Sequence, residues 1–145
     1  MIRMSSDSIF LSSAKALVNP VNTVGVMGKG LAYQFKKKYY TNYILYNELC
    51  ANSGFDIGDI FITQALDGKM IVNFPTKKHW RNPSRFEYIE AGLITLARRI
   101  KEIELPSISL PMLGCGLGGL EKSVVLGTIK KHLSELECDI IIHSV

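Results

Sequence analysis

Short apolar runs recur along the chain between polar and glycine-rich segments, and they predict buried strands. The runs are Ala16–Val18, Ile60–Thr63, Met70–Phe74, Ile108–Leu110 and Ile140–His143. Each is bounded by Gly, Pro, Asp or Ser, which are typical of turns and strand ends. The pattern therefore indicates a sheet whose strands are buried.

Apolar residues at helical spacing predict helices between these strands. The clearest begins at Ser84, which forms a capping box with Glu87, and runs to about Glu102. Its predicted buried face consists of Phe86, Ile89, Leu93, Leu96 and Ile100.

Two further helices follow glycine clusters. One carries Val125, Ile129, Leu133 and Leu136 on a single face, and the other carries Leu31, Phe35 and Tyr39 after Gly30. Lys36, Lys37 and Lys38 are expected to be its solvated carboxyl end, where positive charge is favourable.

Strands that alternate with helices are typical of an α/β sandwich with a parallel or mixed central sheet. In such folds, ligands bind at the carboxyl ends of the strands, where loops lead into helices. Segments 19–30, 75–84 and 111–119 follow predicted strands and are unusually rich in glycine or in basic residues. These three loops are the candidates for a binding site.

Composition narrows the class of protein. The 145 residues, with 47% hydrophobic and 21% charged, fit one folded domain that spans 1–145. The net charge of +4 suits a polyanionic partner, although a solvated basic surface would give the same value. The three cysteines are widely spaced, and the sequence shows neither a signal peptide nor a membrane-spanning stretch. These features predict a cytoplasmic protein without a membrane association. A monomer is expected.

The glycine-rich loop reads Gly114-Cys115-Gly116-Leu117-Gly118-Gly119, which has the G-x-G-x-x-G spacing of a dinucleotide-binding turn. Glycines let backbone N–H groups approach a diphosphate, and the following helix adds partial positive charge. Too little chain follows Gly119 for a complete Rossmann domain, so the loop predicts a diphosphate cradle on another α/β fold. A tight turn without a ligand is the alternative, and Cys115 is expected to be a small loop residue rather than a nucleophile.

The first loop contains GVMGKG, whose spacing does not fit a P-loop. Asn19 and Asn22 precede it and offer amides for sugar hydroxyls, although such residues also serve as ordinary turn formers. Two glycine loops and paired amides indicate a ligand that carries a diphosphate and sugars.

Segments 18–39, 71–93 and 109–120 together resemble the macrodomains of the DarG type, which belong to antitoxins that reverse ADP-ribosylation of DNA. The similarity extends from about Met4 to Val145. It implies a macrodomain fold, a three-layer α/β/α sandwich with a mixed central sheet, and a cleft for ADP-ribose without any other cofactor.

The resemblance also implies roles for single residues. Asp7 would hold the adenine amino group with Ser8 beside it, Asn22 and the loop 28–31 would hold the distal ribose, and the segment 113–119 would wrap the diphosphate. The predicted ADP-ribose-binding residues are Asp7, Ser8, Asn19, Asn22, Gly28, Lys29, Gly30, Leu31, Thr76, Pro111, Leu113, Gly114, Cys115, Gly116, Leu117, Gly118 and Gly119.

The essential lysine of the DarG group aligns with Lys77. Because side chains alternate along a strand, Asn73 and Lys77 are expected to point to one side and Lys78 to the other. Lys77 could lose its proton and act as a nucleophile, either on the ribose or on the ring-opened aldehyde as a Schiff base. It could instead remain charged and donate a hydrogen bond to the departing base or the distal ribose as the glycosidic bond stretches. The sequence leaves both roles open, as well as a plain surface charge.

The residues that follow Lys77 suit nucleic acid. Trp80 could stack on a base, while Lys78, His79 and Arg81 meet phosphates or base edges. The alternatives are Trp80 as a core aromatic that covers the helix after Ser84, and His79 as a proton-transfer group. The sequence contains no clustered His, Cys and carboxylate set, so no metal site is predicted.

Two departures from the related macrodomains matter. Relatives that cleave ADP-ribose esters carry an Asp at the position of Gly118, and DarG macrodomains do not. Full-length DarG has a second domain that binds its toxin, a DNA ADP-ribosyltransferase, so the chain is expected to be an excised domain or a stand-alone enzyme, with a cognate toxin as its partner.

The expected function is removal of ADP-ribose from bases of single-stranded DNA, with thymine preferred over guanine. Hydrolysis of protein adducts and non-catalytic binding of ADP-ribose are the alternatives.

Overall fold

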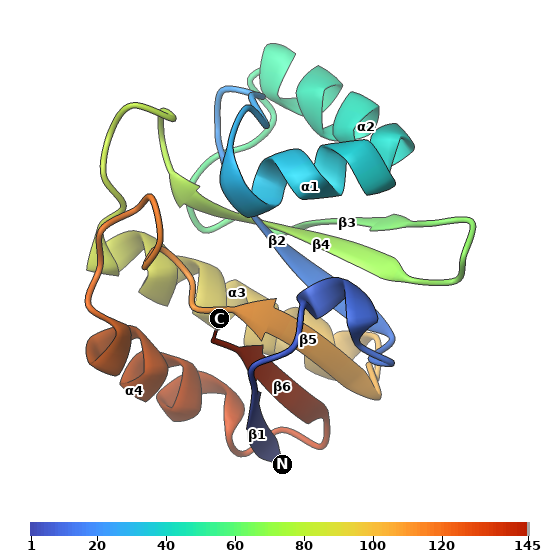
Figure 1. The fold of residues 1–145 in the computed structure, drawn as a ribbon, viewed down its shortest axis with the longest axis vertical. Helices are drawn as coiled ribbons and strands as arrows, with labels where there is room; N and C mark the ends of the chain where they lie inside the picture. Colours follow the sequence, from blue (N-terminus) through green and yellow to red (C-terminus); the bar gives the residue numbers. More distant parts are fainter. Residues whose placement is uncertain (145) are drawn as a thin grey trace.

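A mixed six-stranded sheet lies between two layers of helices in the computed structural model, which describes residues 1–144 (Figure 1). The elements in chain order are β1 (Ile2–Ser5), the short 3₁₀ helix η1 (Ile9–Leu11), β2 (Ala16–Asn22), α1 (Gly30–Lys38), α2 (Tyr40–Ala51), β3 (Phe61–Gln64), β4 (Met70–Lys77), α3 (Phe86–Glu102), β5 (Ser107–Pro111), α4 (Lys122–Leu133) and β6 (Asp139–His143).

The strands follow the spatial order β1-β6-β5-β2-β4-β3. All neighbouring pairs are parallel except β3 with β4, which form an antiparallel hairpin. The predicted α/β sandwich with a mixed sheet is therefore confirmed. Central strands β2, β4 and β5 have their carboxyl ends at one edge of the sheet, which is where the three predicted loops begin.

Each face of the sheet buries its own apolar cluster. Helices α3 and α4 cover one face, where the largest cluster includes Phe74, Leu93 and Ile129. Helices α1 and α2 cover the other face, where smaller clusters are built around Phe35 and Tyr46 (Figure 1). The protein is thus a three-layer structure, as its alternating elements indicate.

Helix α3 packs very closely on the sheet. A Cβ atom on Gly92 would overlap the ring of Phe74, which is fully buried. The glycine therefore lets the helix approach the ring of β4, at some cost in helix propensity.

A network of amides lies buried between β2, β4 and α2. The Asn73 amide donates to Asn42 Oδ1 at 2.8 Å, and both Asn42 and Asn19 donate to Asn73 Oδ1, at 3.0 and 3.3 Å. Thr63 adds a hydroxyl that donates to Asn42 Oδ1 at 2.7 Å. Buried amides that are paired in this way fix the strand register, because a slip would leave them without partners.

Several predicted boundaries were wrong. Ser84 is not a helix cap: α3 begins at Phe86 after Arg85, whose side chain makes no capping bond. Phe86 is 37% exposed and does not belong to the buried face, and Leu136 lies beyond the end of α4.

Strand β1 and helix α2 did not emerge from the sequence pattern. None of the helices in residues 1–144 is long and apolar enough to cross a bilayer.

Candidate functional site

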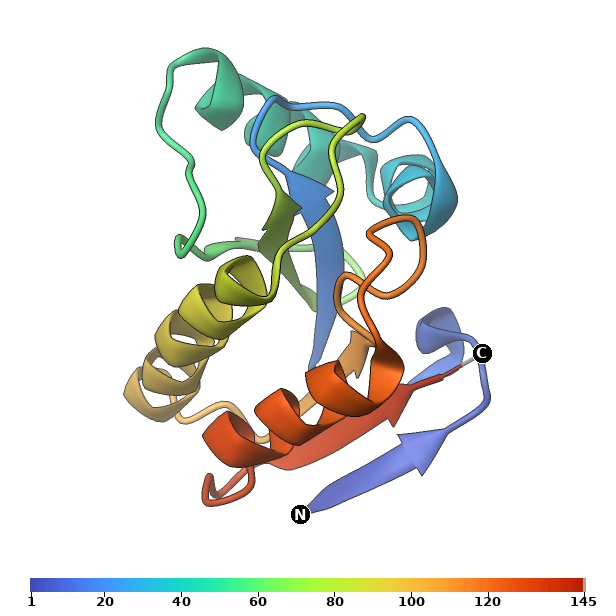
Figure 2. The ribbon, with the colours of Figure 1, turned by 90° about the vertical axis from the view of Figure 1, so that its left-hand side faces the viewer.

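A cleft of about 840 Å³ opens where the loops after β2, β4 and β5 meet. Figure 2 shows these loops gathered beyond the carboxyl end of β2, beside the start of α1. The lining residues are Pro20, Val21, Asn22, Val26, Gly28, Lys29, Gly30, Leu31, Ala32, Thr76, Lys77, Trp80, Arg81, Asn82, Pro83, Pro111, Met112, Gly114, Gly116, Leu117 and Gly118. The expectation that the three loops form one site is confirmed.

Most of the residues predicted to bind ADP-ribose line this cleft. Those that do not are Asp7, Ser8, Asn19, Leu113, Cys115 and Gly119, and of the predicted nucleic-acid contacts Lys78 and His79 also lie off the lining. Asn19 is fully buried and belongs to the amide network described above.

Asp7 and Ser8 are exposed and lie beyond β1. The backbone carbonyl of Asp7 lies 2.9 Å from Nδ1 of the buried His143, and Ser8 Oγ accepts from the N–H of Phe10 at 3.3 Å. These contacts hold the segment before η1 in place and leave the Asp7 carboxylate on the surface.

The glycine-rich loop is folded back on itself, and it leaves no space for side chains at Gly114 and Gly118. Gly114 has φ +75°, and its carbonyl accepts from the N–H of Leu120 at 2.9 Å. A Cβ on Gly118 would overlap both the Gly114 carbonyl and Ser84 Oγ. Position 118 therefore cannot carry the carboxylate of the ester-cleaving relatives in this loop conformation.

Ser84 fastens the glycine-rich loop to the start of α3. Its N–H donates to the Gly118 carbonyl at 3.0 Å, while its buried Oγ has no hydrogen-bond partner in residues 1–144. Ser84 therefore holds the loop through its backbone N–H and does not act as the helix cap that the sequence pattern predicted.

Lys77 connects two of the loops. Its Nζ donates to the carbonyl of Leu117 at 3.2 Å and to that of Trp80 at 3.4 Å. An ammonium group has three N–H donors. One donor therefore remains for a ligand in the cleft.

The alternation that predicts Lys77 and Asn73 on the same side is interrupted before Lys77. Pairing between β2 and β4 shifts register after Val21, so that Asn22 faces Lys77 where strict pairing would give Thr76. The shift interrupts the alternation of side chains. Asn73, which precedes the shift, is buried in the amide network, whereas Lys77 is only partly buried at the cleft.

Asn22 organises the loop after β2. Its Oδ1 accepts from the N–H groups of Val24, Gly25 and Val26 and from the hydroxyl of Tyr46, and its Nδ2 donates to the Val26 carbonyl at 2.8 Å. Only one N–H of this amide is left for a ligand. The side-chain oxygen of Asn22 therefore acts as a turn former, which was one of the two predictions. One N–H of its amide is still available for a ribose hydroxyl, as the other prediction requires.

Trp80 is not a core residue, because 43% of it is exposed. The Arg81 guanidinium lies 4.6 Å from the centre of its ring, and the His79 ring stacks beside it at 5.1 Å. Lys78 lies over the ring of Tyr88 at 5.8 Å. The loop after β4 thus presents an exposed ring that lies beside a guanidinium and an imidazole, which is an arrangement suited to a nucleobase and its phosphates.

Cys115 is not activated. Burial raises the pKa of its thiol above the ordinary value, despite the opposing effect of Lys122. A thiol that is protonated at neutral pH is a weak nucleophile.

Seven lining residues were missed from the sequence: Pro20, Val21, Val26, Ala32, Asn82, Pro83 and Met112. Most are apolar or prolines adjacent to the predicted motifs, so only their proximity to those motifs could have indicated them. In residues 1–144, no three His, Cys, Asp or Glu side chains are grouped so that they could hold a metal ion.

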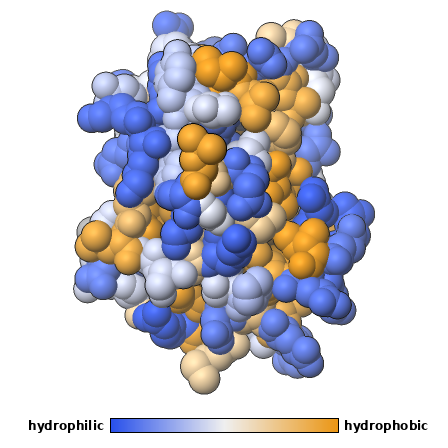
Figure 3. Space-filling view, turned by 90° about the vertical axis from the view of Figure 1, so that its right-hand side faces the viewer, coloured by the Kyte–Doolittle hydropathy of each residue, from blue (hydrophilic) through white to orange (hydrophobic). Residues whose placement is uncertain are grey.

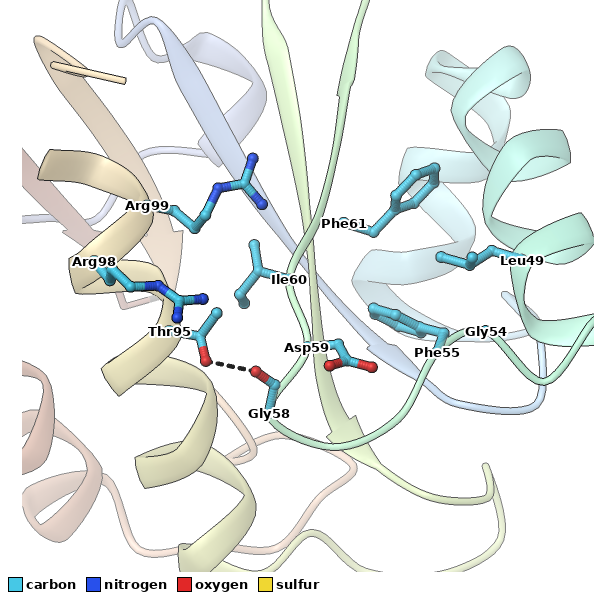
Figure 4. A pocket seen from close by; sticks show the side chains of 10 residues that line it. All are labelled: Leu49, Gly54, Phe55, Gly58, Asp59, Ile60, Phe61, Thr95, Arg98 and Arg99. Carbon is cyan, nitrogen blue, oxygen red and sulfur yellow. Dashed lines mark hydrogen bonds between the residues drawn. The ribbon is translucent and has the colours of Figure 1, made fainter. Parts of the chain in front are cut away.

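A second hollow of about 450 Å³ lies between α3, β3 and the segment that follows α2. Arg98 and Arg99 project from α3 toward one side of it, and Phe55 and Phe61 line the other (Figure 4). Thr95 donates to the Gly58 carbonyl at 2.6 Å, and Arg98 pairs with Glu102 at 3.2 Å. This hollow shares no lining residue with the cleft.

Comparison with known proteins identifies relatives over nearly the whole chain. The Macro domain family model matches residues 18–129. The DNA ADP-ribosyl glycohydrolase of Mycobacterium tuberculosis is 49% identical over 124 residues, which cover 83% of this chain and 35% of that protein. The chain therefore spans about a third of the length of this relative.

Solved structures agree with this relationship. The macrodomain of Thermus aquaticus DarG has a TM-score of 0.95 and 44% identity, with 100% of this chain and 99% of that chain covered. Thermosipho africanus DarTG in complex with ADP-ribose has a TM-score of 0.91 and 33% identity, with 98% of this chain and 41% of that chain covered.

Proposed function

The chain belongs to the Macro domain family, and on that premise we propose that it is a glycohydrolase that removes ADP-ribose from bases of single-stranded DNA. The observation that carries the proposal is the position of Lys77, a cleft-lining lysine whose Nζ lies between the glycine-rich loop and the Trp80 loop. The name of the M. tuberculosis relative, DNA ADP-ribosyl glycohydrolase, supports an activity on ADP-ribosylated DNA.

ADP-ribose occupies the cleft in this proposal. The glycine-rich loop receives the diphosphate, because its backbone can approach phosphate oxygens without interference from side chains. The distal ribose lies between the start of α1 and Lys77, where Gly28, Gly30 and Leu31 line the wall. Asn22 contributes its one remaining N–H to this end of the site.

In the reaction, the bond between the distal ribose C1″ and the base nitrogen breaks, and its electron pair stays on the base. The oxygen of a water molecule bonds to C1″, and a proton from that water is transferred to the base. Lys77, with two N–H groups held by carbonyls, directs its third toward the departing base or the ribose. A donor fixed in advance stabilises charge as it develops in the transition state.

Gly118 favours a DNA adduct over a protein ester. The ester-cleaving relatives place an acidic side chain at this position, and here a Cβ would overlap Ser84 and the Gly114 carbonyl. Lys77 is therefore the main catalytic group that the proposal assigns, without a second acid from this loop.

The proposed substrate is a modified nucleotide in a single strand, with thymidine preferred. Trp80 and Arg81 line the cleft and offer a stacking surface and a positive charge next to it. A DNA ADP-ribosyltransferase toxin that makes the modification is the proposed functional counterpart, and the monomer is the proposed state.

The test is the release of ADP-ribose from an oligonucleotide that carries one ADP-ribosylated thymidine, with the native protein compared with Lys77→Ala. The native protein is expected to restore the unmodified oligonucleotide, and Lys77→Ala to act roughly 100- to 1,000-fold more slowly. Calorimetry with free ADP-ribose should show binding by both proteins. Binding without any turnover by the native protein would reject the thymidine adduct as the substrate and leave a guanosine adduct, a protein adduct or a non-catalytic reader.

A further inference from the structure

The outer surface of α1 and the start of α2 combines exposed aromatic rings with lysines. Tyr33 is 44% exposed and Tyr40 is 58% exposed. Lys37 Nζ lies 5.3 Å from the ring centre of Tyr33, and Lys36 Nζ lies 4.4 Å from that of Tyr43. We call these five residues the tyrosine–lysine face.

The five side chains form two contacting groups, Tyr33 with Lys37 and Lys36 with Tyr43 and Tyr40, which are adjacent through Lys36 and Lys37 of α1. The rings of Tyr40 and Tyr43 are 5.7 Å apart, so they join α2 to the lysines of α1. Figure 3 shows the side of the molecule from which the β3–β4 hairpin projects, and hydrophilic, intermediate and hydrophobic groups are mixed at the height of α1 and α2.

The charge of this face is not neutralised within the described part of the chain. Helix α1 contains no acidic residue, and the ion pairs in residues 1–144 involve other cations. The charge of Lys38 is one of the groups that lower the pKa of the Asp67 carboxyl. Lys38 is not part of the face, because it lies over Phe10 on the η1 side of α1. Stabilisation of the helix dipole explains lysines at the end of α1, but it does not explain exposed tyrosines beside them.

The tyrosine–lysine face begins at the rim of the cleft. Gly30, Leu31 and Ala32 form the first turn of α1 and line the cleft, and Tyr33 follows directly. With a rise of about 1.5 Å per residue, Lys37 lies only about 10 Å along the helix from Gly30. That distance is within the reach of nucleotides adjacent to one held in the cleft.

We propose that the tyrosine–lysine face binds single-stranded DNA next to the modified nucleotide. This inference rests on the proposed function, and it extends the DNA contact from the Trp80 loop to a second part of the rim. Tyrosine rings provide stacking surfaces for any base, and the neighbouring ammonium groups provide charge for the phosphates. A face of this kind binds by backbone and stacking, so it is expected to be indifferent to base sequence.

The test measures binding of an unmodified, fluorescently labelled oligothymidylate of about 12 nucleotides by anisotropy at several salt concentrations. Removal of both face lysines in the double variant Lys36→Ala/Lys37→Ala is expected to reduce the slope of log K against log salt by about 1.4, or 0.7 for each phosphate contact with a single strand. Tyr33→Ala is expected to weaken binding roughly 5- to 150-fold through lost stacking. Circular dichroism should show the fold intact, since these side chains are on the surface.

A matched control removes the same charge elsewhere. The double variant Lys101→Ala/Lys130→Ala changes two exposed lysines on α3 and α4, which cover the opposite face of the sheet. It should leave the salt slope within about 0.3 of the native value if local contacts rather than net charge determine binding. An equal loss in both double variants would overturn the inference.

The outcomes also separate this inference from the proposed function. If the native protein hydrolyses the ADP-ribosylated oligonucleotide and the face variants bind and hydrolyse like the native protein, the face has no role in DNA binding and the proposed function stands. If the native protein binds oligothymidylate through the face but releases no ADP-ribose, the face is a DNA-binding surface and the proposed function is wrong.

Discussion

Lys77 Nζ and the carbonyl oxygen of Leu117 lie 3.2 Å apart, although the two residues are separated by 40 positions in the chain. Leu117 also approaches α1, because a Cβ on Gly30 would lie 3.4 Å from its side chain. One lysine therefore connects the loop after β4 to the loop after β5, and the second of these reaches the start of α1. The cleft depends on these contacts between loops.

Lys77→Arg should separate the two roles that a lysine could play. If Lys77 acts as a charged donor, arginine keeps the charge and should retain more activity than alanine, although its planar group fits the two carbonyls poorly. We expect rates roughly 10- to 100-fold below native, compared with 100- to 1,000-fold for Lys77→Ala. Borohydride reduction during turnover should trap no ADP-ribose on the protein. A trapped adduct, with an arginine variant as inactive as the alanine variant, would establish the nucleophile instead.

Gly118→Ala should disturb the glycine-rich loop. The added methyl group would overlap Ser84 Oγ and the Gly114 carbonyl, so the loop must shift. We expect calorimetry to show a loss of ADP-ribose affinity of about tenfold or more, and stability to fall by about 1–3 kcal/mol. Gly116→Ala is the control, because nothing lies within 4 Å of a Cβ there. Equal affinities for the two variants would mean that the loop adapts freely.

Trp80→Ala should weaken the binding of DNA more than the binding of free ADP-ribose. The exposed ring, with Arg81 lying 4.6 Å from its centre, is placed for stacking on a base. Loss of one stacking contact should reduce the affinity for an oligonucleotide roughly 5- to 150-fold in an anisotropy assay. Leu66→Ala removes another exposed apolar side chain, in the turn between β3 and β4, and should have no effect. An oligonucleotide affinity unchanged by Trp80→Ala would remove this residue from the DNA contact.

Gly92→Ala should destabilise the fold although alanine favours helices. The methyl group would overlap the Phe74 ring, and overpacking of this kind costs about 1–3 kcal/mol, against a propensity gain of at most about 1 kcal/mol. Gly127→Ala in α4 meets open space and should stabilise the protein by up to about 1 kcal/mol. Urea unfolding midpoints provide the comparison, and a stabilised Gly92 variant would contradict the close packing of α3 on β4.

Stability should decline at alkaline pH. Burial raises the pKa of the Cys50 thiol from 9.0 to about 11, and burial together with the hydrogen bond to Asp67 raises that of Tyr39 from 10.0 to about 12. Both groups therefore keep their protons to a higher pH in the folded chain than in the unfolded chain. Their stabilising contribution is complete below about pH 9 and is lost as the pH rises toward 12.

Urea midpoints measured between pH 7.5 and 11 should fall, and the fall should be smaller in Cys50→Ala. A midpoint that stays constant over this range would show that neither group is coupled to unfolding.

The central strands could be predicted because each is a short run of apolar residues buried on both faces. Strand β1 escaped because it lies at the edge of the sheet, with Arg3 and Met4 exposed. Helix α2 escaped because the residues it buries are Asn42 and Tyr46, which leave no apolar stripe in the sequence. A helix is recognised from its apolar face, and this helix binds the sheet partly through an amide.

The three loops could be predicted because glycines and basic residues follow the strands directly. The contacts of single residues in these loops could not be predicted from the sequence. The register shift after Val21 depends on how β2 pairs with β4, and Pro20 and Pro75 in these strands signal an irregularity in the pairing but not its position. Ser84 has the pattern of a helix cap, but its N–H bonds to the Gly118 carbonyl, a residue that only the folded chain brings near.

The arrangement of the cleft has a consequence for the evolution of specificity. Loops after β2, β4 and β5 provide more than half of its lining, and the rest comes from the ends of these strands and the first turn of α1. The apolar clusters that hold the fold together lie mainly between the helices and the sheet. Substitutions in the loops can therefore accumulate with little effect on the core. A lineage can explore new adducts by changing a few surface positions, while Gly118, where the surrounding atoms leave no space for a larger residue, resists exchange. Divergence among relatives is accordingly expected at the rim, where a different base or protein side chain would be recognised, before it reaches the part of the cleft that holds the common ADP-ribose.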